Sequence, residues 1–145
     1  MEHVPPSPLF HKPASIVAAK NILYAGLFLT ILTWALGWWT TAVYAQAPVQ
    51  SVVTLILTVG ITYALIKCIG LGMKWARVVL LVLFLLGVAV FPWTLLVLLK
   101  ASIVVAVLSL LQAILQIIAL YFLFSHASTQ WFDRVKEKAQ NEPAA

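Results

Sequence analysis

Four long stretches of this chain contain no Asp, Glu, Lys, Arg or His, and apolar side chains dominate each of them. A helix needs about 20 such residues to cross the hydrocarbon core of a bilayer. Because a chain in lipid must satisfy its backbone polar groups internally, apolar stretches of this length favour helices. The sequence therefore predicts an all-α integral membrane protein, a four-transmembrane-helix bundle followed by a short amphipathic C-terminal helix.

Turn residues, interfacial aromatic residues and cations set the expected boundaries of these spans. The predicted spans cover residues 22–45, 49–66, 78–93 and 101–124. They form a membrane domain, residues 21–125, between an N-terminal lead, residues 1–20, and a C-terminal tail, residues 126–145. A signal-peptidase site at Ala45-Gln46-Ala47 is the competing interpretation. It is disfavoured because the preceding apolar run exceeds the roughly 7–15 residues of a signal peptide.

Pro92 leaves the end of the third span open to two interpretations. Proline removes a backbone donor and clashes with the preceding helical turn, so it either kinks a helix or ends it. We expect an end or a sharp kink at Pro92. The segment from Thr94 to Leu99 is then expected to be an apolar connection near the membrane surface.

The basic residues predict the orientation of the protein. Eight of the nine Lys and Arg residues flank one side of the predicted spans, and only Lys100 falls on the other side. Cytoplasmic flanks of membrane helices carry such an excess, so both termini are expected in the cytoplasm. Several side chains at span ends are expected to anchor the protein at the headgroup level. These predicted interface anchors are Trp38, Trp39, Trp75, Arg77, Trp93, Trp131 and Phe132.

Small and hydroxyl residues recur at helical spacing within three of the spans. Membrane helices associate through close packing and inter-helix hydrogen bonds, so these stripes predict that the first, second and fourth spans meet. The third span offers only Gly87 and Ala89 and is expected to face lipid or a partner. The predicted helix-packing residues are Gly26, Thr30, Thr33, Gly37, Thr54, Thr58, Thr62, Ala106, Ser109, Gln112, Ala113 and Gln116.

The tail carries an amphipathic pattern. Ser128 or Thr129 can cap a short helix. In such a helix Trp131, Phe132 and Val135 share one face, with most charges on the other. This pattern predicts a helix that lies in the inner membrane interface as an anchor. A docking surface for a cytoplasmic partner is the alternative.

Side chains suited to catalysis or metal binding lie outside the predicted spans. All four acids are in the terminal tails, and the three histidines have no ligand spacing. The single Cys68 excludes an intramolecular disulfide and a multi-cysteine metal site. We therefore expect no enzyme activity, no metal and no cofactor. The net charge of +5 comes from span flanks rather than from a basic patch with interleaved aromatics, so nucleic acid is not an expected partner.

Two short segments of the sequence resemble segments of other membrane proteins. One is Gly72-Met73-Lys74-Trp75-Ala76-Arg77, and the other runs from Leu120 to Ser125 and is followed by Trp131-Phe132. Together with the four-span layout, they resemble a loose group of small, mostly uncharacterised bacterial inner-membrane proteins. The resemblance implies a bacterial inner-membrane location and no particular activity.

Two classes of function remain. The first is a non-catalytic membrane component, such as an accessory subunit, adaptor or immunity-type protein, that binds another membrane protein or a second copy through helix–helix contacts. The second is a small self-associating transporter or pore, holin-like proteins included, with a neutral polar path. The residues that would line the path are Thr54, Thr58, Thr62, Gln112 and Gln116. Proton-coupled exporters need an intramembrane carboxylate, which the spans lack, so the first class is favoured.

Overall fold

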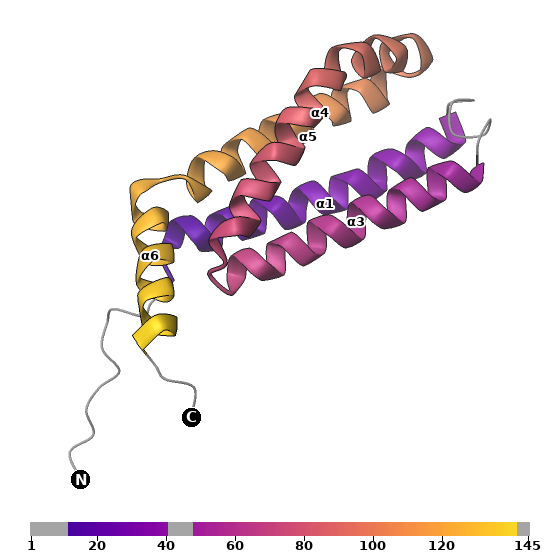
Figure 1. Cartoon of the computed structure of the whole chain (residues 1–145). Helices are drawn as coiled ribbons and strands as arrows, with labels where there is room; N and C mark the ends of the chain where they lie inside the picture. The colour runs from indigo at the N-terminus through magenta and orange to yellow at the C-terminus, as the bar shows by residue number, and fades with distance from the viewer. Residues whose placement is uncertain (1–11, 41–47, 142–145) are drawn as a thin grey trace.

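The computed structural model of the protein describes residues 12–40 and 48–141. These residues form the helices α1 (Ala14–Thr40), α3 (Pro48–Gly70), α4 (Lys74–Ala101), α5 (Ile103–Leu123) and α6 (His126–Asn141) (Figure 1). The first four of these helices are long and apolar enough to cross a membrane. The protein is therefore an all-α, multi-pass membrane protein with a short C-terminal helix, which confirms the predicted fold class.

The helices extend beyond the predicted spans. The helix α1 already begins at Ala14, within the predicted N-terminal lead, and its first turn is closed by a hydrogen bond from Ile16 N to the carbonyl of Pro13 (3.0 Å). The other end of the first predicted span, residues 41–45, lies outside the described residues. The loop expected over residues 67–77 is much shorter, because α3 continues to Gly70 and α4 already begins at Lys74.

A Schellman motif ends α3 and turns the chain into α4. Met73 N donates to the carbonyl of Cys68 (3.1 Å), and Gly72 N donates to the carbonyl of Ile69 (3.0 Å). This motif requires a left-handed residue after the helix, and Gly72 supplies it with φ +84°. The glycine, rather than a long basic loop, therefore sets the tight connection between α3 and α4.

Pro92 does not end its helix. It lies inside α4, which continues to Ala101, so the expected connection over Thr94–Leu99 is wrong and this segment is helical. Proline is tolerated in membrane helices because neighbouring groups adjust around the missing donor. Here Thr94 Oγ1 donates to the carbonyl of Val90 (3.2 Å) in the turn that contains the proline.

The chain reverses at Ser102 instead. This residue alone separates α4 from α5, and its backbone is extended, with φ −162° and ψ 116°. Ser102 N donates to the carbonyl of Leu98 (2.7 Å), and its own carbonyl accepts from Ala106 N (3.1 Å). One serine therefore closes α4 and opens α5, which holds these two helices as a tight hairpin.

The four spans form a ring. Extensive contacts join α1 to α5, α5 to α4, α4 to α3 and α3 to α1, and the pair α1 and α5 makes the largest interface. The first span therefore packs on both the second and the fourth, as expected, whereas α3 and α5 lie diagonally opposite and form no comparable interface. From their shared turn, α3 and α4 diverge (Figure 1). In its most apolar stretch α4 has no buried residue, which agrees with the expected exposure of the third span.

Two packed clusters hold the ring together. The larger one, here called the α6-end cluster, draws buried side chains from all five helices: Ile16, Ala19, Leu23, Leu65, Ile66, Ile69, Ala76, Ala119, Leu123, Trp131 and Phe132. The smaller, far-end cluster joins α4, α5 and α1 through Leu98, Val105 and Ala106, with Leu36 and Leu95 packed against them. Among the described residues, α3 contributes no side chain to the far-end cluster.

Candidate functional site

An open cavity of about 740 Å³ lies between the four spans. All four helices line it, mostly with Leu, Ile, Val and Phe side chains. The polar lining residues are Thr30, Thr54, Thr58, Thr62, Thr94, Ser109, Gln112 and Gln116. None of the described residues that line it is charged. Leu57 and Val88 in its walls are about half exposed, so the cavity opens to the exterior of the bundle, where the bilayer would be.

Helical periodicity brings the polar side chains to this place. Thr54, Thr58 and Thr62 are spaced by four residues on α3, and the same spacing separates Gln112 from Gln116 on α5. Because α3 and α5 lie diagonally across the ring, these two rows face the cavity instead of each other.

The predicted helix-packing residues therefore divide into two groups. Most of them line the cavity: Gly26, Thr30, Thr54, Thr58, Thr62, Ser109, Gln112, Ala113 and Gln116. The remaining three, Thr33, Gly37 and Ala106, are buried. Ala106, 1% exposed, lies in the far-end cluster, where its small side chain permits the close packing that the stripe predicted.

One inter-helix hydrogen bond crosses from α5 to α1 at the cavity. Gln112 Nε2 donates to Thr30 Oγ1 (2.7 Å), and Thr30 Oγ1 in turn donates to the carbonyl of Gly26 (3.0 Å). This bond joins the first and fourth spans, and both of its residues belong to the predicted helix-packing set. It also fixes the Gln112 side chain at the cavity wall.

Of the other polar groups at the cavity, Thr94 and Ser109 donate to carbonyls of their own helices, and the rest have no partner within the described part of the protein. Thr54, Thr58, Thr62 and Gln116 make no hydrogen bond there. A Cβ atom added at Gly26 or at Gly87 would meet no atom within 4 Å. Gly26 therefore borders empty space, and the expectation that it brings two helix backbones close together is wrong.

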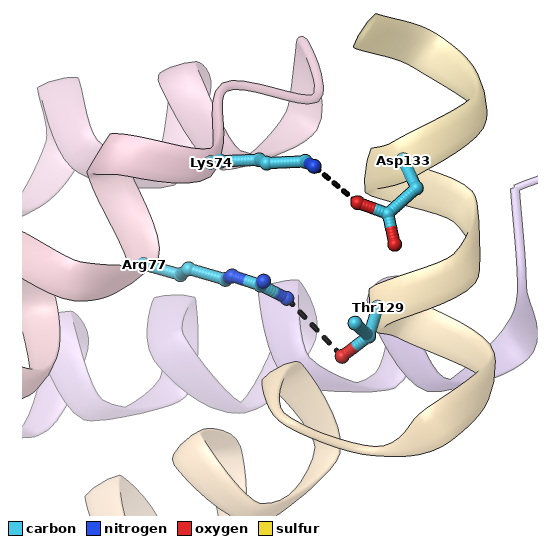
Figure 2. A network of polar contacts seen from close by, with 4 residues as sticks. All are labelled: Lys74, Arg77, Thr129 and Asp133. Carbon is cyan, nitrogen blue, oxygen red and sulfur yellow. Dashed lines mark hydrogen bonds and ion pairs between the residues drawn. The ribbon is translucent and has the colours of Figure 1, made fainter. Parts of the chain in front are cut away.

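A network of polar contacts attaches α6 to the start of α4 (Figure 2). Lys74 forms an ion pair with Asp133, and Arg77 donates to Thr129 Oγ1 (3.3 Å). The hydrogen bond and charge of Lys74 hold the pKa of the Asp133 carboxyl below its ordinary value. The ion pair therefore contributes at neutral pH and is lost only as the pH falls through that lowered pKa.

The apolar face of α6 is buried in the protein. Phe132 is 0% and Trp131 8% exposed, and both belong to the α6-end cluster. The guanidinium of Arg77 lies over the Phe132 ring, 5.0 Å from its centroid. These positions differ from the expectation that Trp131, Phe132 and Arg77 anchor in the bilayer surface. Side chains from the ends of the other helices pack against the face that would otherwise lie in lipid.

The start of α6 also differs from the prediction. The helix begins at His126, so neither Ser128 nor Thr129 is its N-cap. Ser128 is fully buried, and its Oγ donates to the carbonyl of Phe122 (2.7 Å) and lies 2.8 Å from Ser15 Oγ. This serine therefore joins α6 to the ends of α1 and α5. In contrast, the predicted anchors Trp39, Trp75 and Trp93 are exposed on the helices, as contact with headgroups requires.

Neither the cavity nor the pairing of Lys74 with Asp133 was predicted from the sequence. Thr54, Thr58 and Thr62 share one face of α3, and this row of hydroxyl side chains was the sequence feature that pointed to a polar-lined cavity. For the ion pair, the signal was Asp133, the first of three acids in a cationic tail that follows the fourth span on the same side as the cations between the second and third spans.

Comparisons with protein-family models, with curated proteins and with solved structures found no match. The resemblance to small bacterial four-span proteins therefore rests on the two short segments alone.

Replacing Gln112 with leucine or Thr30 with valine is expected to lower the free energy of unfolding by about 0.6–1.7 kcal/mol, because each removes the same inter-helix hydrogen bond. The double variant should cost little more than either single variant. Reversible unfolding of the purified protein in mixed micelles would measure this double-mutant cycle. Fully additive effects would show that the two side chains do not interact.

Proposed function

We propose that the protein is a non-catalytic component of a bacterial inner membrane that acts by binding another membrane protein through helix–helix contacts. An accessory subunit, an adaptor or an immunity-type protein would work in this way. The bilayer is its environment, and α4 is the helix that takes the partner.

The exposure of α4 carries this proposal. Along the whole length of the helix only Ala76 and Leu98, near its two ends, are buried. Between them, the face that includes Val82, Leu85 and Leu86 does not line the cavity, and these side chains are about half exposed. Because membrane helices gain stability from close packing, a helix packed so sparsely within its own chain is suited to pack against another.

The pore hypothesis has one observation in its favour. The residues expected to line a neutral path, Thr54, Thr58, Thr62, Gln112 and Gln116, all line the cavity. The α6-end cluster argues against it, because buried side chains from five helices close that end of the bundle. A path through the protein would require this cluster to separate, so binding is the better-supported function.

Photo-crosslinking along α4 tests the proposal. A benzophenone amino acid placed at Val82 or at Leu86 is expected to capture one specific membrane protein in native membranes. Phe28 on α1 is the matched control, since it is 67% exposed and Leu86 is 60% exposed. The adduct should disappear when Leu85 is changed to Trp on the same face. Capture at Phe28 equal to that at Leu86 would contradict the proposal, and a product of twice the chain mass would indicate self-association instead.

Both termini are proposed to lie in the cytoplasm, because all but one of the basic residues flank that side. Alkaline phosphatase fused at Pro48 or after Lys100 should be active in the periplasm, while green fluorescent protein fused at Gly72 or Ala145 should fluoresce in the cytoplasm. Phosphatase activity from a fusion at Ala145 would overturn this orientation.

A further inference from the structure

We propose that the cavity between the four spans binds a neutral amphiphile from the bilayer, a molecule with one apolar chain and an uncharged hydrogen-bonding headgroup such as a hydroxyl. This inference concerns the interior of the ring. It does not depend on the proposed binding of a partner to the outer face of α4.

The position of the cavity determines where its ligand comes from. The cavity lies between helices long and apolar enough to cross the membrane, and half-exposed residues of α3 and α4 form its walls. Its α6 end is closed by the packed α6-end cluster. A ligand would therefore enter sideways from the lipid phase, between the diverging helices α3 and α4 (Figure 1).

The size of the cavity favours a small molecule over a partner helix. Its volume of about 740 Å³ falls within the range of roughly 300–1,000 Å³ that is usual for small-molecule sites. A helix about 10 Å across would fill it with only about two turns. A partner helix spanning the bilayer therefore cannot be its occupant.

The lining residues define the chemistry of the ligand. Most of them are apolar, which suits an alkyl chain. No charged residue lines the cavity in residues 12–40 and 48–141, so an ionised headgroup would be buried there without a described partner of opposite charge. Thr58, Thr62 and Gln116 nevertheless offer hydrogen-bonding groups that no protein group satisfies in the described part of the chain. An uncharged headgroup that donates and accepts hydrogen bonds matches this lining.

The empty space beside two glycines provides a way to block the site. Leucine at Gly26 or at Gly87 would extend into the cavity, because an added Cβ meets no atom within 4 Å at either position. Gly60 on α3 is the matched control. It has the same open surroundings but does not line the cavity.

Photolabelling of the full-length protein in phosphatidylcholine nanodiscs tests the proposal. The probe is hexadecanol with a diazirine in the middle of its chain, and the labelled peptides are identified by mass spectrometry. Labelling is expected on the cavity-lining parts of α3 and α5. Unlabelled hexadecanol should compete at least about tenfold better than hexadecanoate or hexadecyltrimethylammonium, because the cavity has no charge to pair with either ion.

The variants complete the test. Gly26→Leu and Gly87→Leu should each reduce labelling of the cavity by about tenfold, while Gly60→Leu leaves it unchanged. Gln116→Leu should weaken competition by hexadecanol about threefold to tenfold, the effect of one lost hydrogen bond. Each variant must first elute as a single species with unchanged helical circular dichroism. Labelling spread evenly over the outward faces, equal loss in Gly60→Leu and Gly87→Leu, or equal competition by the charged analogues would each overturn the proposal.

Discussion

Replacing Phe132 with alanine is expected to lower the free energy of unfolding by about 3–5 kcal/mol. The phenyl ring is 0% exposed and packs in the α6-end cluster with side chains from the four spans. Its removal leaves an internal void and also takes away the ring beneath the guanidinium of Arg77. Reversible unfolding in mixed micelles, followed by tryptophan fluorescence, would measure the loss.

Lys136→Ala on the same helix is the control for this prediction. Lys136 is exposed, so its replacement should change stability by no more than about 0.5 kcal/mol. If Phe132→Ala and Lys136→Ala both had negligible effects, α6 would be detached from the bundle. Its aromatic face would then lie in the bilayer surface, as the sequence pattern alone suggested.

Replacing Gly72 with alanine is expected to cost about 2–4 kcal/mol. The left-handed backbone, with φ +84°, is unfavourable for a residue with a Cβ by about 1–2 kcal/mol. In addition, the new Cβ would lie 2.7 Å from Val135 Cγ1 of α6, and such overpacking typically costs about 1–3 kcal/mol. The same unfolding assay applies.

The backbone cost and the overpacking cost of Gly72→Ala can be measured separately. Adding Val135→Ala to Gly72→Ala should relieve the overpacking and leave only the backbone cost. Gly60→Ala is the control, because Gly60 lies inside α3 with open space around it, and alanine there should stabilise the helix by about 0.5–1 kcal/mol. A double variant no more stable than Gly72→Ala would show that α6 does not press on this turn.

The features that could be predicted from the sequence are those set by the composition and length of single segments. Four uncharged apolar stretches leave a chain few choices other than membrane helices, so the fold class was accessible from composition and length. Pro92 was misjudged because the rule for proline weighs one lost hydrogen bond, whereas the strongly apolar segment 93–99 keeps its backbone hydrogen bonds by staying helical. The single-residue reversal at Ser102 leaves no distinctive pattern in the sequence.

The site was predictable only in part. Spacing placed the threonines and glutamines on the correct helix faces, and the bond between Gln112 and Thr30 followed from this. Whether such faces touch or enclose a space depends on which helices are neighbours around the ring, and periodicity carries no information on that order. The aromatic face of α6 posed a similar problem, because the same amphipathic pattern fits a lipid surface and a groove in the protein.

The Schellman turn at Gly72 is the point about which α3 would tilt relative to the other spans. Its turn end is fixed by the α6-end cluster, while the far-end cluster holds the other spans without it, as far as the described residues extend. With 23 residues at about 1.5 Å of rise each, α3 is about 35 Å long. A tilt of about 10° at the turn would shift the far end of a helix of this length by about 6 Å. Such a tilt would change the width of the opening between α3 and α4 through which the ring interior meets the bilayer.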